Sequence, residues 1–271
     1  MVAVPDRFDG RLVEALKPRL TRYIPVVPHP RQQAFLWLPV FEAFFGGASG
    51  GGKSAALLMA ALQYVDIPGY AALILRRTFA DLNKSGALIQ MAHEWLGGTD
   101  ARWAGDTHTW TFPSGAKLAF GHMETEKDRF SYKGTELQYI GFDELTAFTE
   151  IQYRYMFSRM RRRTSINVPL RVRSASNPGD IGHEWVQRRL VDGRQAGRVF
   201  IPSKLADNPS LDQEEYIRSL EELDPVTRAQ LLNGDWSARQ SGGKFKREWF
   251  QVVDAPPVGC RWVRRWALAG T

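Results

Sequence analysis

Residues 41–54 read Phe-Glu-Ala-Phe-Phe-Gly-Gly-Ala-Ser-Gly-Gly-Gly-Lys-Ser, and this stretch decides the fold. An apolar run leads straight into a glycine-rich loop, in which Gly47, four further residues and Gly52-Lys53-Ser54 satisfy the P-loop pattern. The Ala- and Leu-rich run that begins at Ala55 supplies the helix that should follow the loop. Because the strand and the helix fit as well as the motif, an accidental glycine-rich surface loop is a poor alternative.

The residue types of this loop suit a phosphate ligand. Glycines let the backbone bend so that successive N–H groups point at phosphate oxygens, and the following helix adds the positive end of its dipole. Lys53 should reach the β- and γ-phosphates, and Ser54 should place its hydroxyl on Mg²⁺. We expect a nucleoside triphosphate to be held by Gly47, Ala48, Ser49, Gly50, Gly51, Gly52, Lys53 and Ser54.

A second motif, at residues 137–144, reads Leu-Gln-Tyr-Ile-Gly-Phe-Asp-Glu, which is typical of a buried parallel strand that ends in two carboxylates. Asp143 should hold Mg²⁺ through its water shell, and Glu144 should polarise the attacking water as a general base. The alternative is a strand followed by an acidic helix N-cap. Because the chain also has a P-loop, we favour a metal ligand at Asp143 and a general base at Glu144. We expect the strand that carries both acids to adjoin the P-loop strand.

The composition is typical of a soluble globular chain. Of its 271 residues 44% are hydrophobic and 24% are charged, and no run approaches the ~18 apolar residues of a membrane span. The N-terminus lacks the apolar core of a secretion signal. Cys260, the single cysteine, excludes an internal disulfide framework and agrees with a reducing cytoplasm. A net charge of +7 weakly favours a polyanionic partner, for which nucleic acid is the natural candidate.

Strand-like and helix-like segments alternate along the chain, which predicts an α/β fold with a mainly parallel sheet and helices on both faces. Residues 109–121 look like two short strands around a Pro-Ser-Gly turn, an antiparallel extension of the sheet. The other expected strands are 71–75 and 170–177, and the expected helices are 79–96 with a break near Ser85-Gly86, 149–163, 213–223 and 225–233.

These patterns divide the chain into three regions. Residues 1–200 should form the core, residues 201–236 a small helical lid, and residues 237–271 a connector followed by a strand that is barely begun. Helical spacing would put Arg159, Arg162 and Arg163 on one face. Such a face either tracks a DNA backbone or is a solvated helix end.

Several further motifs stand in a fixed order around the P-loop and the acidic strand. They are Arg76-Arg77, Phe112-Pro-Ser-Gly115, Tyr132-Lys-Gly134, Ser176-Asn-Pro178, Asp207-Asn-Pro-Ser-Leu211 and Leu232-Asn-Gly-Asp-Trp236. In this order they resemble, over nearly the whole chain, the large terminase subunit of tailed bacteriophages. The resemblance implies a P-loop ATPase core of the ASCE, RecA-like type that hydrolyses ATP, with Mg²⁺, to move double-stranded viral DNA into a procapsid.

The resemblance also implies partners and residue roles. The partners are double-stranded DNA, a portal protein, a small terminase subunit and further copies in a ring, with a monomer expected for an isolated fragment. The place of action is the host cell cytoplasm, outside the mature virion and away from membranes. Gln32 looks like the residue that reads adenine, although a polar residue at a helix start fits equally. Ser176 and Asn177 look like the motif that couples ATP turnover to DNA movement, although an Asn-Pro turn that ends a strand fits in either case.

Two departures from the family pattern bear on activity. The expected arginine finger is replaced by Lys133, so either Lys133 or Arg129 should act on the γ-phosphate, unless both are ordinary surface cations. Full-length relatives continue into an RNase H-like nuclease with an aspartate where this chain has Ala267, so no nuclease activity is expected in these residues. A helicase-like ATPase and a nucleotide switch without hydrolysis are the competing functions.

Overall fold

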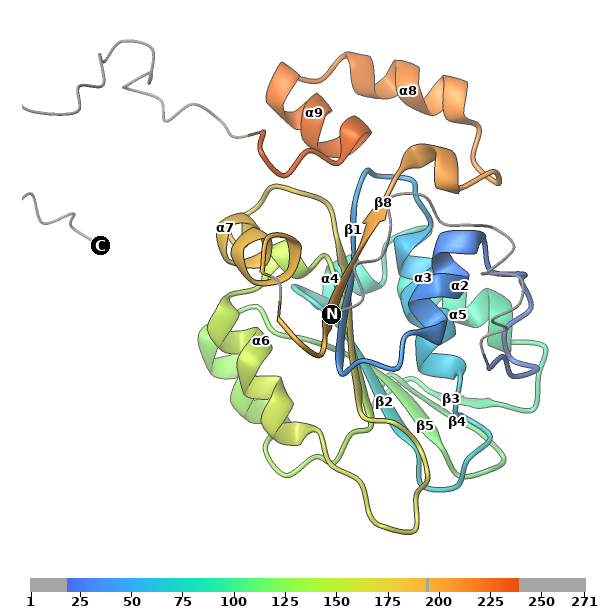
Figure 1. The fold of residues 1–271 in the computed structure, drawn as a ribbon. Helices are drawn as coiled ribbons and strands as arrows, with labels where there is room; N and C mark the ends of the chain where they lie inside the picture. The colour runs from blue at the N-terminus through green and yellow to red at the C-terminus, as the bar shows by residue number, and fades with distance from the viewer. Residues whose placement is uncertain (1–18, 194, 239–271) are drawn as a thin grey trace, which may run out of the picture. The chain divides into compact units, whose positions relative to one another are not determined.

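The computed structural model describes residues 19–193 and 195–238, which build an eight-stranded sheet covered by helices (Figure 1). The strands lie in the order β3-β4-β5-β2-β6-β7-β1-β8. Their bounds are β1 Glu42–Gly47, β2 Ala71–Arg76, β3 Arg102–Ala104, β4 Thr109–Thr111, β5 Lys117–His122, β6 Tyr139–Asp143, β7 Arg171–Ser176 and β8 Arg198–Ser203. The expected α/β fold with a mainly parallel sheet is confirmed.

The pairing confirms one expectation about the sheet and corrects another. β4 runs antiparallel to β3 and β5, so the predicted antiparallel extension is present, while β1, β2, β5, β6, β7 and β8 pair in parallel. The acidic strand β6 does not adjoin the P-loop strand β1, because β7 pairs with both and lies between them. The acids therefore face the P-loop across the end of a third strand.

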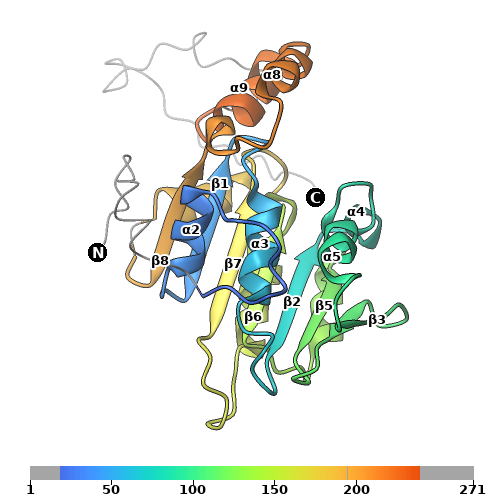
Figure 2. The same cartoon turned by 90° about the vertical axis from the view of Figure 1, so that its right-hand side faces the viewer.

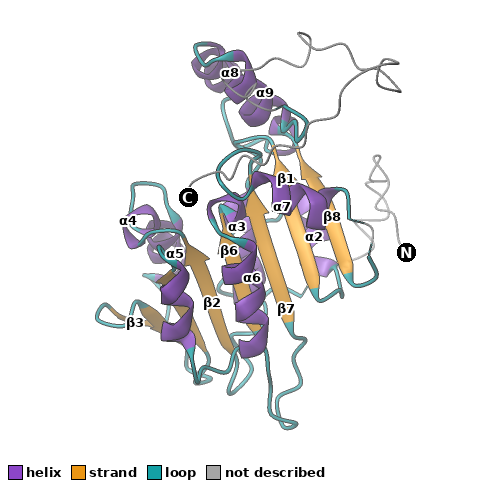
Figure 3. Cartoon of the chain, turned by 90° about the vertical axis from the view of Figure 1, so that its left-hand side faces the viewer, coloured by secondary structure: helices purple, strands orange, loops and turns teal. Residues whose placement is uncertain are grey.

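Helices cover both faces of the sheet, as expected. On one face lie α2 (Pro30–Trp37), α3 (Lys53–Leu62) and α5 (Leu88–Leu96), and the short α4 (Phe79–Leu82) precedes α5 (Figure 2). On the other face lie α6 (Glu150–Met156) and α7 (His183–Val186) (Figure 3). Successive side chains of a strand point to opposite faces of the sheet. In β1, Phe45 therefore packs in the core under α3, and Phe44 packs in the core under α6.

The helices α8 (Gln213–Glu221) and α9 (Pro225–Asn233), in the region expected to form a lid, follow the last strand. Asp212 and Asp224 cap them by accepting hydrogen bonds from backbone N–H groups of the first turn. Trp236 is buried against Phe44 of β1, at a centroid distance of 5.5 Å. Since β8 extends to Ser203, the core boundary expected at residue 200 falls inside a strand of the sheet.

The helix predicted over residues 149–163 is too long. α6 ends at Met156, a 3₁₀ turn covers Phe157–Arg159, and the following arginines are not helical. The chain leaves the helix because the N–H of Leu137 donates to the oxygen of Arg159, and Arg161 donates back to Leu137, which draws this segment alongside the sheet. Arg159, Arg162 and Arg163 therefore do not share a helix face.

The connector and strand expected in residues 239–271, with Ala267, lie outside the described residues. Within the described part of the chain, no helix has the length and apolar character needed to cross a lipid bilayer.

Candidate nucleotide-binding site

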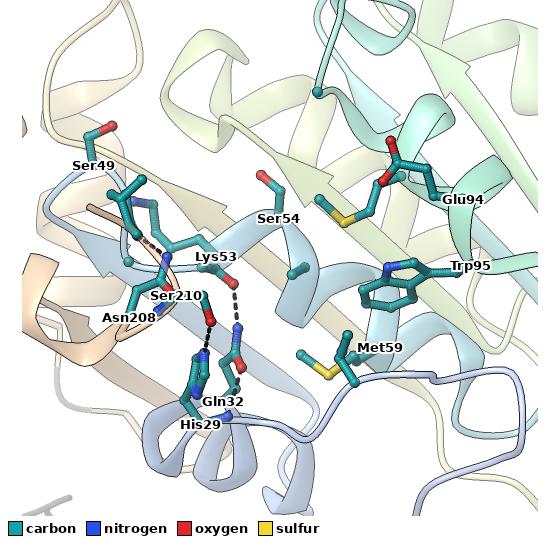
Figure 4. Close-up of a pocket in the computed structure, with 18 of the residues that line it drawn as sticks. His29, Gln32, Ser49, Lys53, Ser54, Met59, Glu94, Trp95, Asn208 and Ser210 are labelled. Atoms are coloured by element: carbon teal, nitrogen blue, oxygen red, sulfur yellow. Dashed lines mark hydrogen bonds between the residues drawn. The ribbon is translucent and has the colours of Figure 1, made fainter. Parts of the chain in front are cut away.

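The predicted nucleotide residues meet at the carboxyl edge of the parallel strands, where a cavity of about 810 Å³ opens between the P-loop, α2, α5 and the start of the lid (Figure 4). The sequence-predicted residues that line it are Gln32, Ser49, Gly50, Gly51, Gly52, Lys53, Ser54, Glu144 and Asn177. Gly47 and Ala48 form the base of the loop, where Ala48 donates to the backbone oxygen of Ser203 at 2.8 Å.

The loop needs glycine for two different reasons. Gly50 and Gly52 have φ values of 74° and 73°, a left-handed conformation that side chains rarely adopt. Gly51 has no such φ, but a Cβ atom there would lie 2.0 Å from the hydroxyl oxygen of Ser203. The end of β8 thus fits closely beneath the loop and fixes its path.

Lys53 is buried in the loop, with 8% of its surface exposed. Its ammonium group donates to the backbone oxygen of Ala48 at 2.5 Å and to Oδ1 of Asn177 at 2.7 Å. Burial lowers the pKa of Lys53 from 10.5 to about 8, against the opposing charges of Glu144 and Asp143. Both acceptors are neutral oxygens, so a phosphate oxygen, which is charged, can replace them.

Asp143 is almost fully buried at the end of β6. Its Oδ1 accepts a hydrogen bond from the Ser54 hydroxyl at 3.0 Å, and its Oδ2 has no hydrogen-bond partner in the described structure. Burial, followed by the neighbouring Glu144, raises the pKa of Asp143 from 3.8 to about 6. A buried carboxylate whose second oxygen makes no hydrogen bond, next to a hydroxyl, fits the oxygen ligands that Mg²⁺ prefers beside phosphates.

Glu144 follows with a left-handed backbone, at φ 52° and ψ 58°. This conformation is unusual for a residue other than glycine and turns the side chain away from the path of the strand. Ser176 at the end of β7 donates to Oε2 of Glu144 at 3.4 Å and exchanges a 2.7 Å hydrogen bond with Thr146. Ser176 and Asn177 thus contact the acidic strand and the P-loop lysine respectively.

Arg76 belongs to this site, and sequence reasoning did not assign it a role. Its Nε lies 3.3 Å from Oδ2 of Asp143, an ion pair without hydrogen-bond geometry, and its Nη2 lies 3.7 Å from Oε1 of Glu144. The sequence contained a signal for this position, because an arginine at the end of a predicted parallel strand lies at the same sheet edge as the acids. The side chain therefore supplies the positive charge that both carboxylates share.

Gln32 is buried where α2 meets the P-loop, but its amide is already engaged. Nε2 donates to the backbone oxygen of Gly52 at 2.8 Å, and Oε1 accepts from the N–H of His29 at 2.9 Å. These contacts tie the start of α2 to the P-loop. In this arrangement the two ends of the amide contact backbone groups, so reading an adenine edge stays a prediction.

Arg129 and Lys133 do not line the cavity. Arg129 lies in the 3₁₀ helix Glu126–Tyr132, where it pairs with Glu126 at 2.7 Å and stacks over the ring of Phe130 at 4.4 Å. Lys133 is exposed just after this turn. A role for either residue on the γ-phosphate would have to be exercised on a neighbouring subunit.

Comparison with known proteins identifies the chain's relatives. Residues 44–252 match the family model described as terminase large subunit, T4likevirus-type, N-terminal. A comparison with curated protein sequences gives no significant match.

Three solved proteins have the same fold. The large terminase of the thermophilic bacteriophage D6E has a TM-score of 0.60 at 15% identity, with 81% of this chain and 54% of that chain covered, and a further D6E structure is a complex with ATP-gamma-S. The HK97 bacteriophage large terminase has a TM-score of 0.59 at 12% identity, with 84% and 55% covered. The large terminase ATPase domain of Thermus phage P74-26 has a TM-score of 0.52 at 12% identity, with 79% and 96% covered.

The chain spans about half the length of the D6E and HK97 proteins and nearly all of the P74-26 ATPase domain. The family model covers well over half of the 271 residues, and it includes the P-loop, the acidic strand and the lid. The chain therefore belongs to the terminase large subunit family and corresponds to its N-terminal ATPase region.

Proposed function

We propose that this chain is the ATPase module of a viral DNA-packaging motor, which hydrolyses ATP to drive double-stranded DNA into a procapsid. The observation that carries the proposal is the meeting of Lys53, Ser54, Asp143 and Glu144 at one sheet edge. A phosphate cradle and a paired acid are the two parts that phosphoryl transfer to water requires. Membership of the terminase family supplies the link to DNA packaging.

In the proposed mechanism the loop N–H groups and Lys53 hold the phosphates. Ser54 and Asp143 would hold Mg²⁺, which would neutralise charge on the phosphates. Glu144 accepts the proton of the attacking water, while Arg76, whose Nη2 lies 3.7 Å from Oε1 of Glu144, holds that carboxylate in position. Lys53 exchanges its bond with Asn177 for a phosphate oxygen, so that Asn177 senses whether the γ-phosphate is present.

The proposal extends to the partners. The chain acts in the infected host cell, as one subunit of a ring that works with a portal protein and a small terminase subunit. Either Arg129 or Lys133 then completes the site of the neighbouring subunit. A nucleotide switch without hydrolysis is the competing function, and the general base distinguishes the two, because a switch has no need of Glu144.

Two variants test hydrolysis. Glu144→Gln should bind Mg²⁺·ATP with an affinity close to that of the wild type and lose at least ~100-fold in turnover, the scale of general-base catalysis. Lys53→Ala should lose binding and turnover together. Undiminished turnover in Glu144→Gln, measured as phosphate release at saturating ATP, would remove Glu144 from the mechanism and favour the switch.

A further inference from the structure

The nucleotide cavity continues past the phosphate loop, along α3 towards α5 (Figure 4). Ala55, the first residue after the P-loop motif, and Met59, one helical turn further, line it from the same side of α3. Trp95 of α5 faces this side of the cavity. We call this part the α5 lobe, and its lining residues are Val26, Val27, Ala55, Met59, Met91, Glu94 and Trp95.

The position of the acids fixes the direction in which a bound nucleotide runs. In the proposed function Glu144 and Asn177 would face the γ-phosphate, and Ser54 would hold the metal. The ribose and base would then pass the N-terminal turn of α3, where Ala55 lines the cavity. That path leads over Ala55 into the α5 lobe.

The chemistry of the α5 lobe suits a flat aromatic ligand. Val26 and Val27 line the cavity and are 42% and 82% exposed, so their apolar surface can be covered by a ligand. Trp103 and Trp110 pack against each other at a centroid distance of 5.4 Å, whereas Trp95 has no ring partner among the described aromatic residues. Trp95 is partly buried against the core under α3 and also lines the cavity.

The lobe offers few groups for hydrogen bonds to the edge of a base. The amide of Gln32 is engaged by the backbone of Gly52 and His29. Glu94 is the one charged side chain of the lobe, and its Oε1 accepts a hydrogen bond from Gln90 at 3.1 Å. Affinity for the base must therefore come mainly from stacking and burial rather than from hydrogen bonds to the base edge.

We propose that the α5 lobe is the base subsite of the nucleotide site, in which a purine ring stacks on Trp95 and is flanked by Val27 and Met59. This inference rests on the proposed function, since it takes the phosphates to lie on the P-loop. The larger purine ring covers more of the indole and buries more apolar surface than a pyrimidine. Trp95 thus determines a preference for purine over pyrimidine triphosphates.

Binding of Mg²⁺·ATP-γ-S, Mg²⁺·CTP and Mg²⁺·tripolyphosphate, measured by titration calorimetry, separates the base from the phosphates. Trp95→Ala should weaken ATP-γ-S about 10-fold, the scale of base–aromatic stacking, and should leave tripolyphosphate unchanged. Trp95→Phe should keep most of the wild-type affinity for ATP-γ-S. The control is Trp37→Ala, since Trp37 is 43% exposed and does not line the cavity.

The outcomes distinguish the inference from the proposed function. If Trp95→Ala binds ATP-γ-S as the wild type does, or loses ATP-γ-S and tripolyphosphate equally, the base does not stack on Trp95 and the inference is wrong while ATP hydrolysis stands. If the wild type binds neither ligand, both the inference and the proposed function fail. Should Trp95→Ala not fold, Trp95→Leu keeps the apolar bulk without the aromatic face and gives the same comparison.

Discussion

Replacing Asp143 by asparagine should make the nucleotide-free chain more stable, although it removes a metal ligand of the proposed site. Asp143 is buried, and a pKa raised from 3.8 to about 6 makes its ionisation in the folded chain about 3 kcal/mol less favourable than in the unfolded chain. The amide keeps the shape of the side chain and carries no charge. We therefore expect Asp143→Asn to raise the free energy of unfolding by up to about 3 kcal/mol at pH 8.

The pH dependence has a definite sign. The carboxyl of Asp143 binds its proton more tightly in the folded chain than in the unfolded chain. The wild type therefore loses stability as pH rises from about 4 to about 6, whereas Asp143→Asn does not. The advantage of Asp143→Asn should shrink as pH falls through 6. Urea unfolding followed by circular dichroism, in EDTA and without nucleotide, measures it, and Asp106→Asn, at an exposed turn, is the control.

Adding Mg²⁺ and ATP-γ-S should reverse the order of stability, since the wild type gains binding energy that the variant lacks. A variant that is less stable than the wild type at pH 8 in EDTA, or an advantage that does not change with pH, would refute the reasoning. The carboxylate would then be stabilised rather than strained by its surroundings.

Three further changes test the packing and charge around the site. Lys53→Met should raise the free energy of unfolding by up to about 3 kcal/mol at pH 7, because burial lowers the pKa of Lys53 to about 8. This gain should disappear as pH rises from 8 to 10.5, and urea unfolding at several pH values measures it. Gly51→Ala should impair nucleotide binding in calorimetry because its Cβ meets the Ser203 hydroxyl, and adding Ser203→Ala should restore it; no rescue would mean that the clash is elsewhere. Arg76→Gln should lower turnover at saturating ATP, because Asp143 and Glu144 lose the ion pairs that hold their carboxylates in position; undiminished turnover would contradict this role.

Much of the fold could be predicted because its signals are local. The P-loop, the acidic strand and the breaks between helices are set by neighbouring residues. Strands β2 and β6 lie where their apolar runs predict them, and β7 lies within the segment 170–177 that was expected to be a strand. Strands β3 and β8 were not anticipated. β3 has three residues, and the mixed sequence of β8 is held in the sheet by β1 along its whole length.

What sequence could not supply is the set of contacts between distant segments. The insertion of β7 between the P-loop strand and the acidic strand depends on the pairing of the whole sheet. The contact of Arg76 with the acids, the engagement of the Gln32 amide and the loss of the helix at residue 160 all depend on such partners. A local pattern names the residue types of a site, but it does not say which of them are already bonded to the protein.

The most direct test of the central claim is a crystal structure of this chain with Mg²⁺ and ATP-γ-S. We expect phosphate density against the backbone of residues 47–54, with the metal between the Ser54 hydroxyl and Asp143, and the γ-phosphate beside Glu144. A nucleotide bound elsewhere, or a metal that Asp143 does not approach, would contradict it.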